Sequence, residues 1–247
     1  MEVHHHPDLH HDKKYFREYF LEFLMIFLAV TLGFFAENVR EYYIESEREN
    51  QSMISLAKDL ESDTLQFNGL IRYHVAKISK IDSLLIYFLN NTSNEVPLYQ
   101  YNIIIHLFGH AAFFQNSGTL DQLNNSGGLR LIRKRNVVDS IDAYVQQIKR
   151  LNLRDVYETN FVMDNDKLAQ KLFVGRSALK ILSNSVYSKN KLSQNETVTL
   201  NNQFLDEYLN NLIRFRSFAQ YELALQISVN IKAKRLLALI KKEYHLD

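Results

Sequence analysis

The fold of this chain is decided by residues 15–39, YFREYFLEFLMIFLAVTLGFFAENV. Within them, the apolar run 20–36 is interrupted only by Glu22, Thr31 and Gly33. At about 1.5 Å per residue this run extends roughly 25 Å as a helix, slightly less than a ~30 Å hydrocarbon core. Tyrosine and phenylalanine side chains on the flanks can lie at headgroup level and extend its reach. The stretch is therefore predicted to be one transmembrane helix.

Three other interpretations of the apolar run are weighed against a membrane span. A cleavable signal peptide requires small residues at its cleavage site, but the run ends in Gly-Phe-Phe-Ala at 33–36, with a ring where a small residue is needed. A helix lying flat in the membrane interface requires a strongly charged face, which the centre of this run lacks. A buried helix of a soluble domain stays open, because Glu22 and the modest length weaken the membrane assignment.

Small residues line one face of the predicted span. At 100° per residue, the side chains that point within about 40° of one direction include Glu22, Ala29, Gly33, Ala36 and Arg40. We call these five residues the membrane seam. The spacing from Ala29 to Gly33 lets another helix backbone approach closely, and such packing drives helix association in lipid. Two interpretations of Glu22 stay open: its carboxyl faces protein on this seam, or it extends to the near headgroups.

Residues 1–14 form a histidine-rich tail. It carries five imidazoles, at His4, His5, His6, His10 and His11. Short tracts of this kind often bind zinc, nickel or copper. The alternative is a solvated tail that changes charge at about pH 6.5 and lies against anionic headgroups. We expect loose metal binding at most, and no cofactor is predicted.

Charges beside the span predict its orientation. Lys13, Lys14 and Arg17 precede it, whereas acidic residues dominate after it, and basic flanks favour the cytoplasmic side. The predicted organisation is a cytoplasmic tail over 1–14, a transmembrane helix over 15–39 in the bacterial inner membrane, and a periplasmic helical domain over 40–247.

From residue 40 to 89 the sequence predicts one long helix, because this segment has no proline and only one glycine. Apolar or small residues recur at alternating spacings of four and three, the heptad pattern of packed helices. The seam comprises Met53, Ala57, Leu60, Thr64, Phe67, Ile71, His74, Ile78, Ile81, Leu85 and Phe88. Further apolar residues beside it favour a globular bundle over a two-stranded coil. His74 is expected to be a satisfied core histidine.

The remaining segments are also predicted to be helical. A loop at 90–97 precedes helices expected at 98–114, 117–125, 137–157, 161–173, 177–187 and 199–244. The last helix is expected to bury Phe204, Tyr208, Leu212, Phe215, Ala219, Leu223, Ile227 and Ile231. No run of alternating strands is present. We predict an all-α fold in which the transmembrane helix continues into an antiparallel long-helix bundle with a small irregular insert around 115–135.

Two further clusters were considered as sites. His106 and His110 have the i, i+4 spacing of zinc-binding helices but lack the glutamate of H-E-x-x-H, so core or interface histidines are expected. A basic cluster follows a glycine pair but lacks the pattern of a phosphate-binding loop. It is interpreted as a solvated face or as a site for an acidic partner or lipid headgroup, and comprises Arg130, Arg133, Lys134 and Arg135.

Two stretches carry a resemblance to a known family. The opening MEVHHHPDLHHDKK followed by YFLEFLMIFLAVTLGFFAENVRE resembles the N-terminus of an uncharacterised family of single-anchor membrane proteins from Bacteroidota. The run FQNSGTLDQLNNSGGLRLIRKRNVVDSIDAY resembles the middle of such proteins. The resemblance implies location and lineage, and it brings no reaction, ligand or functional residue.

Composition limits the possible functions. The 247 residues are 46% hydrophobic and 23% charged, enough for an anchor and one domain of about 200 residues with a core. A net charge of +1 lacks the footprint of nucleic-acid binding, and the absence of cysteine excludes disulfides. No catalytic constellation can be assembled from motifs. We expect a non-enzymatic membrane-anchored scaffold or subunit of an envelope complex, a homo-oligomer or part of a larger assembly; the alternative is a ligand-sensing domain that signals through a partner.

Overall fold

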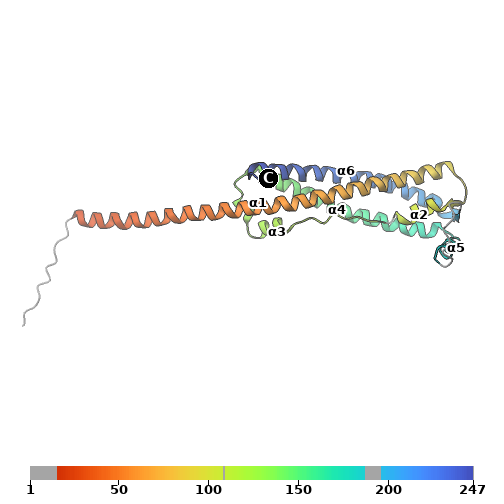
Figure 1. Cartoon of the computed structure of the whole chain (residues 1–247), viewed down its shortest axis with the longest axis horizontal. Coiled ribbons are helices and arrows are strands. Elements are labelled where there is room, and N and C mark those ends of the chain that lie inside the picture. Colours follow the sequence, from red (N-terminus) through yellow and green to blue (C-terminus); the bar gives the residue numbers. More distant parts are fainter. Residues whose placement is uncertain (1–15, 108, 187–195, 247) are drawn as a thin grey trace, which may run out of the picture. The chain divides into compact units, whose positions relative to one another are not determined.

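The computed structural model describes residues 16–107, 109–186 and 196–246 (Figure 1). The described residues are mostly α-helical, and their one sheet has two three-residue strands, so the all-α prediction is confirmed. Contacts divide the chain into two compact units, Met1–Gln51 and Ser52–Asp247. The five tail histidines lie outside the described residues.

The first unit contains the N-terminal part of α1, which extends from Phe16 to Asn90. The predicted anchor and the predicted heptad helix are thus segments of one helix. Within the described residues, α1 is the one helix long and apolar enough to span a membrane: an 18-residue window has a mean hydropathy of 2.1, and none of that window is buried. The apolar side chains here, such as Phe27 and Phe34, face outward, as expected for contact with lipid and not with a protein core.

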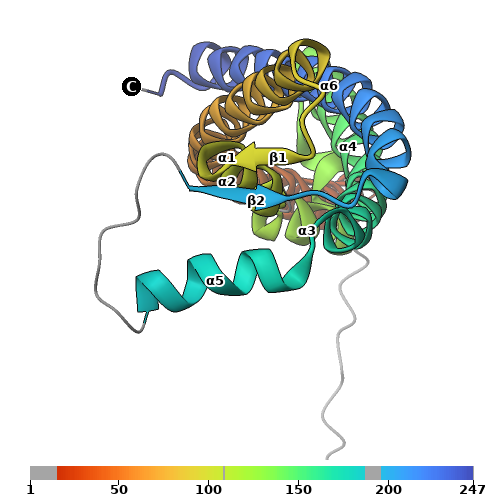
Figure 2. The ribbon, with the colours of Figure 1, turned by 90° about the vertical axis from the view of Figure 1, so that its right-hand side faces the viewer.

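The second unit is built from three long helices: the remainder of α1, α4 (Arg135–Leu172) and α6 (Leu205–Glu243). Figure 2 shows them around a common axis. Contacts from α1 to α6 run in opposite chain directions, as in the pairs Glu61–Lys241 and Asp82–Arg216. Contacts from α1 to α4 run in the same direction, from Asp63–Tyr144 to Lys77–Glu158. Two of the three helix pairs are therefore antiparallel, and α1 and α4 are parallel.

The heptad seam predicted for α1 packs into the bundle. Seven of its eleven positions are buried and the other four are partly buried, whereas the flanking Leu65 and Val75 are exposed. On α4 the buried heptad positions continue without interruption, so the two helices expected at 137–157 and 161–173 form one helix. The predicted break at 158–160 was wrong because it contains neither proline nor glycine, and its polar Glu158 is a buried seam residue.

On α6 the predicted buried face is correct only in its first half. Tyr208, Leu212, Phe215 and Ala219 are buried as expected, but Ile227 and Ile231 are 40% and 45% exposed. The buried residues of α6 keep alternating spacings of four and three, and this spacing includes polar residues. After Ala219 they are Glu222, Gln226, Val229, Ala233, Leu236 and Ile240. The predicted face instead advances by four residues at each step after Ala219, and each such step rotates it by about 40° around the helix axis. The predicted face therefore turns away from the bundle.

Two parallel helices require a long return connection, and it occupies residues 91–134. The chain passes through β1 (Glu95–Pro97) and α2 (Leu98–His106), follows α1 back without regular structure over 109–117, and enters α3 (Gly118–Asn125) and the 3-10 helix η1 (Gly128–Leu131). We call 109–117 the return segment. The helix predicted to continue to residue 114 ends at His106, and the irregular insert is correspondingly longer.

Side chains of α1 replace the helical hydrogen bonds of the return segment. Tyr73 donates to the carbonyl of Gly109, Gln66 donates to that of Phe114 at 2.9 Å, and Asp63 accepts from the Asn116 amide at 2.9 Å. A Cβ atom at Gly109 would lie 2.9 Å from the Tyr73 hydroxyl, so a larger residue there would force the Tyr73 side chain to shift.

The end of the bundle beyond α2 carries a short antiparallel ribbon. Strand β1 pairs with β2 (Thr197–Thr199), which places the buried Val96 opposite the buried Val198. Helix α5 (Gly175–Val186) precedes β2, and the 3-10 helix η2 (Asn202–Phe204) leads into α6. The closing helix therefore begins at Leu205 and not at residue 199, because residues 197–199 pair as a strand.

Candidate functional site

A layer of charged side chains separates two hydrophobic cores inside the bundle. The first core is built from 53–70 of α1, 137–151 of α4 and 225–240 of α6, together with α3. The second core involves 81–84, 162–172 and 208–215 of the same helices, together with α2 and the ribbon. The gap on each helix holds the charged layer, which comprises His74, Lys77, Arg154, Asp155, Glu158 and Glu222.

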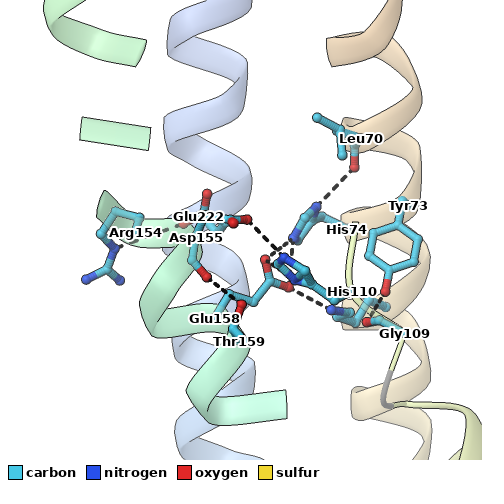
Figure 3. A network of polar contacts seen from close by, with 11 residues as sticks. Leu70, Tyr73, His74, Gly109, His110, Arg154, Asp155, Glu158, Thr159 and Glu222 are labelled. Atoms are coloured by element: carbon cyan, nitrogen blue, oxygen red, sulfur yellow. Dashed lines mark hydrogen bonds and ion pairs between the residues drawn. The ribbon is translucent and has the colours of Figure 1, made fainter. Parts of the chain in front are cut away.

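Glu158 is the centre of this layer and is 1% exposed. Lys77 donates to its Oε1 at 2.7 Å, and the Nε2 atom of His74 lies 3.2 and 3.3 Å from its two oxygens (Figure 3). Burial raises the pKa of Glu158, but the His74 hydrogen bond and the Lys77 charge outweigh burial and lower the pKa to about 2. Glu158 is therefore a carboxylate over the whole physiological range.

His74 faces acceptors on both sides of its ring. Its Nδ1 atom lies 3.1 Å from the carbonyl oxygen of Leu70, one turn earlier on α1, while Nε2 faces the Glu158 carboxylate. A carbonyl and a carboxylate can only accept, so each contact is a hydrogen bond when the ring nitrogen that makes it carries a proton. The expectation of a satisfied core histidine agrees with these contacts, and its partner is a charged residue 84 positions later in the chain.

Glu222 is the opposite case within the same layer. It is 2% exposed, its Oε2 atom has no hydrogen-bond partner among the described residues, and the Nε atom of Arg154 lies 4.0 Å from that oxygen. Arg154 itself stacks over the rings of Phe218 and Tyr221. Burial, followed by the charge of Glu158, raises the pKa of Glu222 to about 7. Glu222 can therefore exchange a proton near neutral pH.

His110 brings the return segment to the edge of the layer. Its Nε2 atom lies 3.1 Å from Oδ1 of Asp155, and its Nδ1 atom lies 3.8 Å from Oε2 of Glu158. Its side chain is 25% exposed, so this edge is open to solvent. Burial raises the pKa of Asp155 against the attraction of His110. His110, Asp155 and Glu158 each offer one donor atom such that the three atoms lie within 4.8 Å of one another. These three side chains could therefore hold a metal ion.

The groups of the charged layer can exchange protons or bind a cation. The hydroxyl group beside them, that of Thr159, is not arranged as a nucleophile. Thr159 donates its hydroxyl to the backbone carbonyl of Asp155 at 3.0 Å instead of facing a base. The chemistry available among the described residues of the layer is charge pairing, proton exchange and ligation.

The structure places the predicted site residues in three different situations. On α1 the membrane seam is exposed, and its Arg40 donates to Glu37 at 2.9 Å. His106 and His110 do not share a helix face, because α2 ends at His106. The basic cluster is exposed, and two of its members form ion pairs: Lys134 with Glu243 at 3.4 Å and Arg135 with Asp139 at 3.2 Å.

The charged layer itself was missed by the sequence analysis, apart from His74. Its members come from three helices, and only the tertiary fold brings them together. A signal was present: Asp155, Glu158 and Glu222 continue the heptad spacing of α4 and α6, so polar residues at seam positions mark the layer. Comparison of the chain with family models, with curated proteins and with solved structures gives no match.

Proposed function

We propose that this chain is a non-enzymatic, membrane-anchored helical-bundle subunit that acts by assembling with another protein or with further copies of itself. The apolar, unburied first part of α1 supports the anchor, with the lipid bilayer as its surroundings. The basic residues before it and the acidic residues after it support a cytoplasmic N-terminus and a periplasmic bundle in the inner membrane. The membrane seam, with Gly33 open on its surface, is a contact site for a second helix.

The observation that carries the assembly proposal is an apolar strip on the outside of the bundle. A shallow hollow between α1 and α6 is lined by Val75, Ile78, Gln220, Leu223, Ala224 and Ile227. Val75 is 52% exposed, and Ile231 continues the strip one turn beyond the hollow. Apolar residues that share one exposed stripe mark interaction surfaces, and a groove between two helices fits the apolar face of a third.

Site-specific crosslinking tests the assembly proposal. A photoreactive residue at Ile227 of the full chain, expressed in membranes, should give one discrete adduct. The same residue at Glu207, exposed on the opposite side of α6, is the matched control and should give none. Ile227→Ser should remove the adduct formed from a second probe at Val75. Adducts of equal yield at Ile227 and Glu207, or none at either, would contradict the proposal.

The orientation can be tested separately, because the chain has no cysteine. Tyr99→Cys introduces a thiol at an exposed position of α2. A membrane-impermeant maleimide should label it in intact spheroplasts, whereas Asp12→Cys in the tail should react only after lysis. The reversed pattern would overturn the orientation.

The second candidate function is ligand sensing by the bundle, with the signal passed to a partner. The charged layer favours it, because buried ionisable groups in the middle of a helix bundle are costly unless they are paired or serve a purpose. Its test is whether a bound ligand changes the crosslinking yield at Ile227. An unchanged yield at saturation would argue against sensing and leave the assembly proposal standing.

A further inference from the structure

We propose that His110, Asp155 and Glu158 form a binding site for a divalent transition-metal ion, with zinc as its probe, and that the ion ties the return segment to α4. The inference goes beyond the proposed function, since metal binding and assembly can each occur without the other. It is separate from the tail histidines, which belong to a different part of the chain.

The donor set fits zinc in type and spacing. One imidazole nitrogen and two carboxylate oxygens are common zinc ligands, with bonds of about 2.0–2.2 Å. Two ligands of a tetrahedral ion are therefore about 3.4 Å apart, and no two ligands of one ion exceed about 4.4 Å. With one donor atom taken from each side chain, the three atoms all lie within 4.8 Å of one another, and the Nε2 atom of His110 lies 3.1 Å from Oδ1 of Asp155. Zinc binding therefore requires the widest pair of donor atoms to move closer together.

The fold positions the three ligands by two means. Asp155 and Glu158 are three residues apart on α4, so both carboxylates project from one face of a continuous helix. His110 arrives from the return segment, whose path is held along α1 by the hydrogen bond from Tyr73 to Gly109, the preceding residue. His110 is 25% exposed and Asp155 is 36% exposed, which leaves an entry path from solvent.

Contacts around the ligands are of the kind that orients metal-binding carboxylates. Lys77 and His74 hold Glu158, with Lys77 on Oε1, so that Oε2 is the oxygen directed at His110. The Lys77 ammonium brings positive charge near the site, which opposes the binding of a cation. The opposing charge is offset by Asp155 and by Glu222, whose Oε2 atom is buried without a hydrogen-bond partner. That buried, unsatisfied carboxylate is an independent indication that the layer accommodates a further cation or proton.

Zinc titration of the full chain in detergent tests the proposal. All five tail histidines are changed to alanine in every protein, which removes binding there. We expect one zinc ion per chain by calorimetry, and a zinc-dependent rise in melting temperature. Asp155→Asn and His110→Ala should each weaken binding by more than the roughly 10- to 100-fold loss typical of residues that only contact a ligand. His106→Ala changes an exposed histidine at the end of α2 and should bind zinc like the background.

Asp155→Asn is nearly isosteric at a partly exposed position, and circular dichroism will verify its fold. No zinc binding by the background protein would overturn the proposal and identify the contacts as plain ion pairs. Equal affinities in the Asp155→Asn and His106→Ala proteins would overturn it as well, because binding would then occur elsewhere. Neither outcome affects the crosslinking expected at Ile227, so failure of the metal site and failure of the assembly proposal can be told apart.

Discussion

The two hydrophobic cores and the charged layer between them occupy the same three helices and the same heptad frame, but they are stabilised differently. In the cores, side chains such as Leu84 and Phe215 are fully buried and contribute through the apolar area removed from water. In the layer, burial is unfavourable for every charge, and the arrangement is stable only through pairing. A seam position can therefore hold a charge when a neighbouring helix supplies its counter-charge.

Glu158 and Glu222 show what pairing changes within the layer itself. Both are glutamates buried to within 2% of their surface, on adjacent helices. Glu158 has two close partners and a pKa of about 2, whereas the Oε2 atom of Glu222 has no hydrogen-bond partner among the described residues and the pKa of Glu222 is about 7. Relative to the ordinary value of 4.5, the same environment thus favours the charge of one residue and opposes that of the other.

The largest effect is expected from removing the centre of the layer. Glu158→Ala leaves Lys77 and His74 buried without their counter-charge, and breaking a buried pair in this way costs about 3–5 kcal/mol. The measurement is urea unfolding of the full chain in detergent, followed by circular dichroism, with a chelator present.

A triple replacement is the control for that experiment. Changing Glu158 and His74 to leucine together with Lys77→Met converts the centre of the layer into core of similar volume. Most of the lost stability should return, because no buried charge is left unpaired. A triple variant as unstable as Glu158→Ala would show that packing, and not pairing, sets the cost.

An effect of intermediate size and opposite sign is expected at Glu222. Its pKa is raised from 4.5 in the unfolded chain to about 7, so the folded state is destabilised above pH 7 and regains stability as the pH falls toward 4.5. Glu222→Gln removes this penalty and should stabilise the protein at pH 8 by at most about 3 kcal/mol, since one pKa unit corresponds to about 1.4 kcal/mol.

The advantage of Glu222→Gln over the wild type should be several-fold smaller at pH 5 than at pH 8, because most of the penalty is lost as the pH falls from about 7 toward 4.5. The comparison uses the unfolding free energy of both proteins at pH 5 and pH 8, with a chelator present. The tail histidines are identical in both proteins, so any contribution from them cancels in the difference. An advantage that is equal at the two pH values would mean that Glu222 does not titrate between them.

Much of the fold could be predicted because apolar residues mark it. The seam from Met53 to Phe88 is almost entirely apolar, and its alternating spacing identified the longest packed segment of α1. On α6 the same method followed Leu223 and Ile227 onto the outer strip, since the true seam continues through Glu222, which no hydrophobicity pattern selects. Polar seam residues are recognised only when the spacing is given more weight than the residue type.

The rest depended on contacts between distant parts of the chain. Strands of three residues at 95–97 and 197–199 are too short to show a period, and each exists because it pairs with the other. Similarly, spacing along a helix groups His110 with His106, whereas α2 ends at His106 and the next segment, which has no regular structure, is held at Gly109 by a hydrogen bond from Tyr73. The candidate metal site could not be found from sequence because two of its three ligands are more than 40 positions from the third.

The smallest effect on stability is expected from a substitution in the second hydrophobic core, which gives the apolar counterpart to the changes in the charged layer. Ile81 is a fully buried seam residue seven positions after His74, so it shares the heptad position of the layer histidine in an apolar environment. Ile81→Val removes one methylene and should cost about 0.5–1.5 kcal/mol. Because no charge is affected, the cost should be the same at pH 5 and pH 8, while that of Glu222→Gln changes. If the Ile81→Val cost varied with pH as strongly as the Glu222→Gln effect, the pH dependence would belong to the bundle as a whole, and the contrast between core and layer would fail.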